Sequence, residues 1–574
     1  MKDLFKNLKE TWRYAKSEKY RLIAYVLLNI LMIGISVIIP IFAAKQMIYL
    51  TESNLERLLG VSLVVSAIEL FRILINHISR TLSINIFVNT YSTLIYALAQ
   101  EVLKLNNKTL DENGSGVFIQ RITNDTFRMS DIYNYLANNL VNIISDLGML
   151  FGIFVINKWA FLYAFTSITI ITIIERLRVI KRNEADKRYR KEAERITGFI
   201  GEMVRGSRDL KMLNAEESFL DEMGERINSS IDLRFSIDKI SRNYGTIANT
   251  TKELTSLGLV LLLIFMLSKG YLIAATALII YNYYGRISSF TRFLGDFSER
   301  IKDFNLSCNR VFEIVDSDVF EKEKFGKKHL DDIDGDIEYK NVYFSYGDNK
   351  VLKGLSFKVK KNETVAIVGK SGSGKTTIFN LLNKFYPVAG GEILLNNTNI
   401  NDLDRDSIRD NITMISQNPY IFNMSIRDNL RLVKKSLKES EMIDACKRAY
   451  LHDFIMTLPD GYDTIIGEGG VNLSGGQKQR LAIARALIQD SQVILFDEAT
   501  SALDNETQGK IQDAINDMKD QYTILIVAHR LSTIINADRI LYLEDGIIKE
   551  EGTHKELMKK SSGYKALYEK ELSK

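Results

Sequence analysis

The chain has 574 residues, enough for three or four domains of about 150 residues each. Its 75 basic and 71 acidic residues give a net charge of +4, which is too even a balance for a dedicated nucleic-acid binder. Two cysteines, Cys308 and Cys446, without a CxxC motif, exclude a disulfide framework and a cysteine-rich zinc site. Long apolar runs fill residues 1–310, whereas residues 330–574 have the pattern of a water-soluble α/β domain.

Residues 1–20 form a charged, amphipathic segment. Its basic side chains surround the apolar residues Leu4, Phe5, Leu8 and Trp12. A signal peptide would instead have a short basic start, an apolar core and a cleavage site of small residues. We therefore predict a helix that lies in the membrane interface, with a solvated surface helix as the alternative.

Six apolar runs approach the length of about 20 residues that a helix needs to cross a bilayer. They are Leu22–Ala44, Leu58–Ile75, Leu136–Ile156, Trp159–Ile174, Leu254–Ser268 and Tyr271–Ile287. Buried helices of a soluble protein are the alternative, but the runs form three hairpins ahead of a separate soluble domain. The prediction is an α-helical membrane domain of six transmembrane helices over residues 21–310.

The links between the spans indicate their orientation. Links 45–57, 157–158 and 269–270 are short, whereas links 76–135 and 175–253 are long, charged and helix-like. Nine Lys or Arg residues lie within 176–195, and positive charge beside a span marks the cytoplasmic side. Both termini and both long links are therefore expected in the cytoplasm. An arm of about 30 helical residues would extend about 45 Å from the membrane.

Several polar residues lie within the predicted spans, where they are costly. Glu69 and Arg72 are spaced to neutralise each other. Two further groups are Asn138, Asn139, Asn142 and Asp146 on one helical face, and Tyr281, Tyr283, Tyr284 and Arg286 in the last span. Both polar packing between helices and a polar, aromatic substrate path explain these groups.

A linker over residues 311–330 leads to a domain over residues 331–574. There the short apolar strand Thr364–Val368 runs directly into a phosphate-binding loop (Walker A) and an apolar helix, the context that supports a P-loop. The loop residues expected to bind nucleotide are Gly369, Ser371, Gly372, Ser373, Gly374, Lys375, Thr376 and Thr377. Lys375 is expected to reach the β- and γ-phosphates, and the Thr376 hydroxyl to ligate Mg²⁺.

The partner motif is the apolar strand Val493–Phe496 followed by Asp497 and Glu498. Asp497 is placed to hold the Mg²⁺ shell, and Glu498 to act as general base on an attacking water. A second anion site is predicted at Ser474, Gly475, Gly476 and Gln477, which begin another helix. Since one P-loop already binds the phosphates, this second site is explained if it caps a nucleotide held by another copy.

Together these motifs resemble an exporter-type ATP-binding cassette (ABC) half-transporter, with an α-helical membrane domain fused to an α/β P-loop ATPase of ABC type. The resemblance covers essentially the whole chain, and no ATPase motif departs from the family pattern. It implies that Tyr346 stacks on adenine, that Gln417 contacts Mg²⁺, and that Asp504 lies in the loop that crosses the dimer interface. His529 resembles the switch histidine at the γ-phosphate, a catalytic role alongside Glu498.

The resemblance also implies contacts between the membrane domain and the ATPase. Gly467–Gly470 is similar to the exporter segment that touches the intracellular loops. Gly116–Asp125 and Val204–Asn214 are similar to the loops that bear the coupling helices.

The implied function is ATP-driven export by a dimer that binds ATP and Mg²⁺. The partner is a second copy or a paralogous half-transporter, with membrane lipid around it and no nucleic acid. The expected substrate is a hydrophobic or amphipathic peptide or drug; a lipid flippase, or half of a heterodimeric multidrug exporter, is the alternative. The apolar spans argue against a soluble ABC ATPase. Fusion of the two domains argues against an importer, and Glu498 with an intact signature argues against a regulated channel.

The composition also points to a cellular location. The lysine-, isoleucine- and asparagine-rich, proline-poor sequence is typical of a low-GC bacterium. We therefore expect a multi-pass protein of the plasma membrane, with both termini and the ATPase domain in the cytoplasm.

Overall fold

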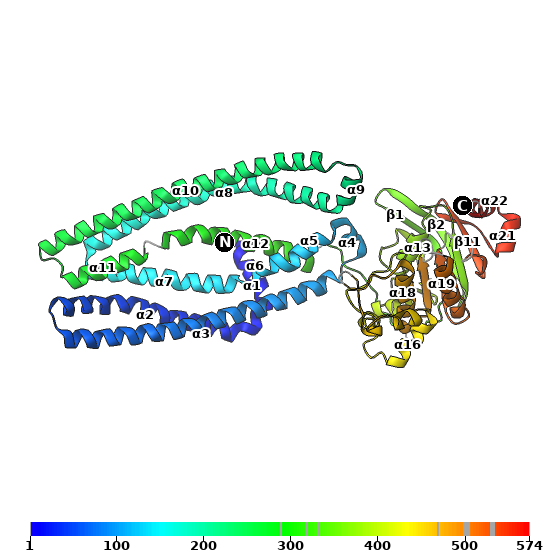
Figure 1. Cartoon of the computed structure of the whole chain (residues 1–574), viewed down its shortest axis with the longest axis horizontal. Coiled ribbons are helices and arrows are strands. Elements are labelled where there is room, and N and C mark those ends of the chain that lie inside the picture. Colours follow the sequence, from blue (N-terminus) through cyan, green and yellow to red (C-terminus); the bar gives the residue numbers. More distant parts are fainter. Residues whose placement is uncertain are drawn as a thin grey trace. The chain divides into compact units, whose positions relative to one another are not determined.

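The structure is a computed structural model that describes residues 2–287, 290–316, 319–330, 333–467, 470–497, 505–527 and 534–572. The chain forms two compact units, each considered by itself (Figure 1). The first, helical unit comprises Met1–Leu103 and Gly114–Phe320, and the second comprises Lys104–Asn113 and Glu321–Lys574. A short piece of the first long link therefore belongs to the second unit.

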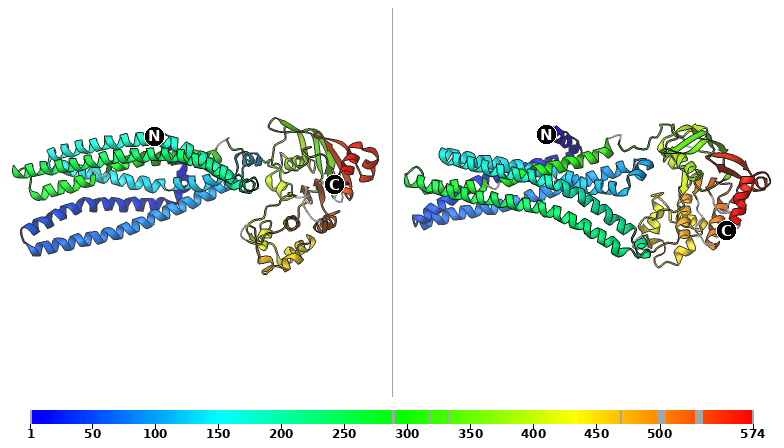
Figure 2. Two further views of the ribbon diagram at one scale, coloured as in Figure 1. Left: turned by 45° about the horizontal axis from the view of Figure 1, so that its top comes forward. Right: turned by 90° about the horizontal axis from the view of Figure 1, so that it is seen from above.

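Long helices build the first unit, and they run side by side along its length (Figures 1 and 2). The helices of ten or more residues are α1 (Lys2–Ala15), α2 (Lys19–Thr51), α3 (Leu55–Val102), α7 (Ile132–Ile156), α8 (Lys158–Arg205), α10 (Glu216–Ser268), α11 (Ala274–Ile287) and α12 (Phe290–Val315). Shorter helical segments are η1 (Lys16–Glu18), α5 (Ser115–Gln120), η2 (Arg121–Asp125), α6 (Thr126–Ser130) and α9 (Ser207–Met212). The helices α3, α8 and α10 extend well beyond their apolar runs, so the long links continue the spans as helices.

Within the described residues, five helical stretches are long and apolar enough to cross a membrane. They lie within 2–51, 55–102, 115–156, 158–205 and 216–268. The sixth predicted span, Tyr271–Ile287, corresponds to α11, which has 14 residues and ends where the description of the chain is interrupted. The helical membrane architecture is thus confirmed, whereas the sixth crossing stays a prediction. The helix α12 also includes the first residues of the predicted linker 311–330.

The amphipathic helix α1 packs on α12 through its small and polar face. The amide of Asn7 donates to Asn305 at 2.9 Å, and the Thr11 hydroxyl lies 3.6 Å from the Cys308 sulfur. The Tyr133 hydroxyl of α7 donates to the Leu8 carbonyl at 2.8 Å. The protein-facing side of α1 is therefore fixed by hydrogen bonds, while Phe5 on another side is exposed. Its position in a membrane interface stays a prediction.

Two polar residues of the last span make hydrogen bonds to α2. The Tyr283 hydroxyl donates to the Val37 carbonyl at 2.9 Å, and Arg286 donates to the Ser36 carbonyl at 3.2 Å. Pro40 lies inside α2 and has no N–H group, so one carbonyl of this helix lacks its usual donor. Hydrogen-bond donors from the last span therefore suit this part of α2. For these two residues, polar packing between helices is the explanation that the contacts support.

The second unit contains a six-stranded sheet of order β12-β11-β3-β10-β9-β6, a four-stranded sheet of order β2-β1-β4-β5, and the pair β7-β8. The strands are β1 (Ile337–Tyr346), β2 (Asn349–Val359), β3 (Thr364–Val368), β4 (Gly390–Leu395), β5 (Thr398–Asn399), β6 (Ile412–Ile415), β7 (Met424–Ser425), β8 (Ile465–Ile466), β9 (Val493–Asp497), β10 (Thr523–Val527), β11 (Arg539–Glu544) and β12 (Ile547–Gly552). The helices are α4 (Asn107–Asn113), α13 (Lys375–Leu382), α14 (Arg405–Arg409), α15 (Ile426–Arg431), α16 (Glu439–Arg448), α17 (His452–Met456), η3 (Gly461–Asp463), α18 (Gly475–Gln489), α19 (Asn505–Met518), α21 (His554–Lys560) and α22 (Ser562–Leu572).

Three central strands of the large sheet, β3, β9 and β10, are parallel and completely buried. Their continuous apolar sequences suit a sheet covered on both faces. Val527 of β10 is paired with Ile367 of β3 on one side and with Asp497 of β9 on the other. The carboxyl ends of the three strands therefore lie together at one edge of the sheet, where ligands bind in open α/β sheets.

Backbone hydrogen bonds join the segment Lys104–Asn113 to the rest of the second unit. The Glu323 amide donates to the Lys104 carbonyl at 2.8 Å, and the Asn106 amide donates to the Glu321 carbonyl at 3.0 Å. The expectation that Gly116–Asp125 carries the first coupling helix stays a prediction. Those residues belong to the helical unit, and α4 is the part of the link that packs on the second unit.

A bulge in β1 restricts which residue can occupy the opposite position in the neighbouring strand β4. Asn341 has a φ of +48°, and the pairing of β1 with β4 shifts between Lys340 and Tyr343. Gly391 of β4 has a φ of +78°, and a Cβ there would lie 2.2 Å from the Asn341 carbonyl oxygen. Both the backbone conformation and the available space therefore require glycine at position 391.

We predict that Gly391→Ala lowers the apparent melting temperature of the purified protein more than Gly461→Ala does. Gly461 has a φ of +52° but open space where a Cβ would be, so its alanine variant experiences only the backbone strain. That strain costs about 1–2 kcal/mol for an L-residue. Gly391→Ala adds a collision with the backbone of β1. Equal losses, measured by thermal unfolding of the two full-length variants, would contradict this interpretation of the bulge.

Candidate nucleotide-binding site

The predicted phosphate loop, residues 369–374, connects β3 to the N-terminus of α13. Gly374 has a φ of +104° and is the N-cap of α13. A Cβ on Gly369 would lie 2.2 Å from the Leu543 carbonyl oxygen of β11. The glycines therefore let the loop fold tightly against the sheet edge. The free N–H groups of the first turn of α13 are directed towards the loop, which favours an anion such as phosphate.

The ammonium group of Lys375 lies over its own loop. Its Nζ donates to the carbonyls of Gly369 at 3.1 Å and Lys370 at 3.0 Å, and the residue is only 5% exposed. The positive charge is thus held among the loop carbonyls. A phosphate oxygen would be a stronger partner, because its negative charge attracts the ammonium group more than a neutral carbonyl does.

Thr376 and Asp497, which were both predicted as Mg²⁺ ligands, are brought together. The Thr376 hydroxyl donates to Oδ1 of Asp497 at 3.0 Å. Asp497 is the last residue of β9 and is 6% exposed, so its carboxylate is held at the sheet edge beside the phosphate loop. A hydroxyl and one carboxylate beside a phosphate site are the oxygen donors that Mg²⁺ uses together with phosphates and water.

The predicted signature residues begin α18. Ser474 is its N-cap and forms a capping box with Gln477: the Gln477 amide donates to the Ser474 hydroxyl at 3.3 Å, and the Ser474 amide donates to Oε1 of Gln477 at 2.7 Å. Gly475 is exposed and Gly476 is buried. The same residues that were predicted to bind an anion therefore also stabilise the helix start.

The signature segment and the phosphate loop line different cavities. Lys370–Ser373 lines a cavity with Asn349–Lys353 and Glu544. Leu473 and Lys478 line another, together with residues 418–423. This separation fits the expectation that the signature acts on a nucleotide held elsewhere.

Gln417 lies in the segment that α18 braces. The Gln479 side chain donates to the Gln417 carbonyl at 3.3 Å. Arg485 of the same helix donates to the carbonyls of Tyr420 at 3.0 Å and Asn429 at 3.1 Å. Arg485 was not identified from the sequence, and its place in the helix after the signature is the only signal that could have indicated it. Because α18 also begins with the signature residues, the segment around Gln417 and the signature are mechanically joined through this helix.

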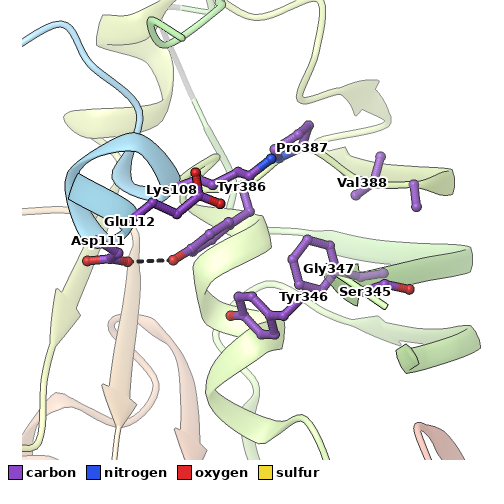
Figure 3. Close-up of a pocket in the computed structure, with 11 residues that line it drawn as sticks. Lys108, Asp111, Glu112, Ser345, Tyr346, Gly347, Tyr386, Pro387 and Val388 are labelled. Carbon is purple, nitrogen blue, oxygen red and sulfur yellow. Dashed lines mark hydrogen bonds between the residues drawn. The ribbon is translucent and has the colours of Figure 1, made fainter. Parts of the chain in front are cut away.

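Tyr346, the predicted adenine contact, lines a cavity of about 540 Å³ (Figure 3). It lies at the end of β1, is 39% exposed, and meets the ring of Tyr386 edge-to-face at 5.2 Å. The Tyr386 hydroxyl donates to Oδ2 of Asp111 at 2.6 Å, so α4 forms one wall of the cavity. Burial, and then the Asp111 carboxylate, raise the pKa of Tyr386, which keeps its hydroxyl protonated as a donor. A cavity of this size with aromatic rings in its wall suits a flat heterocycle.

Neither Tyr386 nor Asp111 was identified from the sequence. Tyr386 lies between α13 and β4 without a motif around it, and Asp111 is 275 residues away in a link between predicted spans. An acidic residue in a charged link gives no sequence signal for such a contact. Three predicted site residues, Glu498, Asp504 and His529, lie outside the described residues.

Comparisons with known proteins agree with this geometry. The family model described as "ABC transporter transmembrane region" matches residues 22–284, and the model described as "ABC transporter" matches residues 352–501. A putative multidrug export ATP-binding/permease protein of Staphylococcus aureus is 31% identical over 98% of this chain and 99% of its own. An ATP-dependent lipid A-core flippase of Photobacterium profundum is 32% identical over 82% of this chain and 81% of its own.

We predict that Tyr346→Ala weakens ATP binding about five- to a hundredfold, since stacking of a base on an aromatic ring contributes about 1–3 kcal/mol. Turnover at saturating ATP should change less. Tyr386→Phe is the matched control, because it keeps the ring and removes only the hydrogen bond to Asp111. Its affinity should stay close to that of the wild type. Unchanged affinity of Tyr346→Ala in a nucleotide titration would move the adenine contact elsewhere.

Proposed function

The chain belongs to the ABC transporter family and couples ATP hydrolysis to export, and we propose that it does so as a dimer in which each ATP lies between two chains. The observation that supports this most directly is the meeting of Thr376 and Asp497 at the phosphate loop, while the signature lies beside another cavity. One chain thus has both halves of a site, but not next to each other. Two chains in antiparallel arrangement would complete two sites.

The proposed mechanism assigns each group one task. Tyr346 binds the base, and the loop amides with Lys375 bind the phosphates. Glu498, which directly follows Asp497, takes a proton from the attacking water as general base. His529, two residues after β10, contacts the γ-phosphate. Ser474–Gln477 of the second chain closes over that phosphate, with Asp504 at the interface, so that ATP stabilises the closed pair of ATPase domains.

The residues present also fit Mg²⁺. Thr376 and Asp497 would hold it, and Gln417 is the proposed third protein ligand. The described residues contain no cluster of three or more His, Cys, Asp or Glu, so the phosphates would have to supply further oxygen ligands. When bound, the ion would neutralise charge on the phosphates.

We further propose that the closure is passed to the spans through α4. The Asp111–Tyr386 hydrogen bond joins α4 to the wall of the base cavity. The exposed tip of the long arms, Val204–Asn214, is the second proposed coupling segment; it includes α9, which has no buried residue, and the exposed side chains Met212 and Leu213. Such an uncovered tip is suited to contact a second chain.

The proposed location is the plasma membrane, with both termini and the ATPase domain in the cytoplasm. The basic residues of 176–195 support this orientation. The proposed substrate is a hydrophobic or amphipathic peptide or drug, in keeping with the multidrug export named for the relative from Staphylococcus aureus. The flippase from Photobacterium profundum favours a lipid as the second candidate. A paralogous half-transporter remains the alternative partner to a second copy.

The dimer is tested by crosslinking Ser373→Cys with Gly475→Cys. Burial raises the pKa of the native thiols of Cys308 and Cys446 to about 12, so neither should compete. We expect a covalent dimer on oxidation in the presence of ATP and Mg²⁺. Mixed single-cysteine variants should also link, which proves that the bond joins two chains. Links within one chain only would contradict the arrangement, and no link at all would point to a paralogous partner.

The chemistry is tested by comparing Glu498→Gln with Lys375→Ala. Glutamine keeps the shape of the carboxylate but cannot take a proton, so hydrolysis should fall about 10²–10⁴-fold while ATP still binds. The Glu498→Gln protein should therefore trap ATP and hold the dimer closed. Lys375→Ala should lose phosphate binding, closure and hydrolysis together. Near-wild-type hydrolysis by Glu498→Gln would remove Glu498 from the role of base.

A further inference from the structure

One carboxylate lies in the middle of a predicted span. The span Leu136–Ile156 is part of α7, and Asp146 is ten residues from either end of it. At 1.5 Å per residue, the carboxylate is about 15 Å from each end of the span, close to the centre of a bilayer. A charged group at that depth is expensive and calls for a partner or for contact with water.

Asp146 has no partner within the described residues. It makes neither a hydrogen bond nor an ion pair within 4.0 Å there, and it is only partly buried. Glu69, the other carboxylate in the predicted spans, does have a partner. Its Oε2 lies 2.6 Å from Arg72 on the same helix. The two membrane carboxylates therefore differ: one is neutralised by its own helix, and the other is available to something else.

Asp146 continues a polar stripe along α7. Asn138 and Asn142 precede it at spacings of four residues, and both are exposed. Asn139 differs, because it is buried and donates to the Tyr135 carbonyl at 2.6 Å, a hydrogen bond within its own helix. The stripe of Asn138, Asn142 and Asp146 thus offers two amides and a carboxylate along one face, a surface unsuited to lipid tails.

From these observations we propose that Asp146, with Asn138 and Asn142, is the part of the substrate path that recognises positive charge, and that the substrates are amphipathic organic cations. This assignment rests on the proposed export function. A carboxylate in a medium of low dielectric constant attracts a cation strongly and repels an anion of the same shape. A substrate with a delocalised charge enters most easily, since it loses little hydration. A neutral or anionic lipid would gain nothing from Asp146.

The test uses tetraphenylphosphonium and tetraphenylborate, two probes of nearly the same shape and opposite charge. Binding to the full-length protein in lipid nanodiscs is measured by equilibrium dialysis and corrected with protein-free nanodiscs. We expect selective binding of the cation by the wild type. Asp146→Asn should weaken it by about tenfold or more, which corresponds to at least about 1.4 kcal/mol, and Asp146→Glu should restore much of it. Binding of the anion should not decrease.

Glu69→Gln is the matched control, because it replaces a span carboxylate that Arg72 already neutralises. It should retain cation binding. A measurement on the wild type avoids any loss of folding: dicyclohexylcarbodiimide should modify Asp146, as read by mass spectrometry, and the cation but not the anion should protect it. Equal binding of both probes, unchanged binding in Asp146→Asn, or absence of selective protection would each overturn the assignment.

The outcome is distinguishable from failure of the proposed export function. A protein that hydrolyses ATP and loses that activity in Glu498→Gln, yet binds both probes equally, would retain the proposed function and lose only the substrate class. A protein that binds the cation through Asp146 but does not hydrolyse ATP would retain this site and contradict the proposed mechanism. Neither result depends on the other.

Discussion

The nucleotide site depends on the parallel pairing of three buried strands. Since β10 lies between β3 and β9, the residues that follow each strand are brought to the same edge of the sheet. The strand side chains are buried and contribute packing, so the chemistry is confined to the residues at and after the strand ends. A slip of β9 by one residue would turn Asp497 to the other face of the sheet and separate it from Thr376. The register of this core thus sets the geometry of the site.

This dependence explains which parts of the site the sequence could predict. The phosphate loop is a local structure, and its glycines and Lys375 are recognisable from their order alone. Thr376 and Asp497 are 121 residues apart, yet their meeting follows from two apolar strands that each end in a polar motif. Parallel pairing brings these two residues to the same edge of the sheet, because it places the ends of neighbouring strands together. The signature was predictable for the same reason, since its helix start is a local capping motif.

Contacts that cross between distant loops were not predictable in this way. Asp111 and Tyr386 belong to no motif, and hydropathy separates spans from links without indicating which piece of a link packs on the ATPase domain. The first coupling segment is expected at 116–125, whereas α4 at 107–113 is the piece of the link that belongs to the second unit. The helix α12 continues through Val315, and so includes the first residues of the predicted linker 311–330.

Several polar groups of the membrane helices are paired within one chain. Asn29 donates to the Ser79 hydroxyl at 3.2 Å, Gln46 donates to the Ser62 hydroxyl at 3.0 Å, and Tyr283 reaches a carbonyl of α2. These pairs hold helices together in a medium where apolar surfaces gain little from contact with each other. A polar group that takes no part in such pairing is then informative, because no structural purpose explains its cost. Among the described residues of the spans, the Asp146 carboxylate is such a group. The proposed partner of this carboxylate is a substrate that enters from outside the chain.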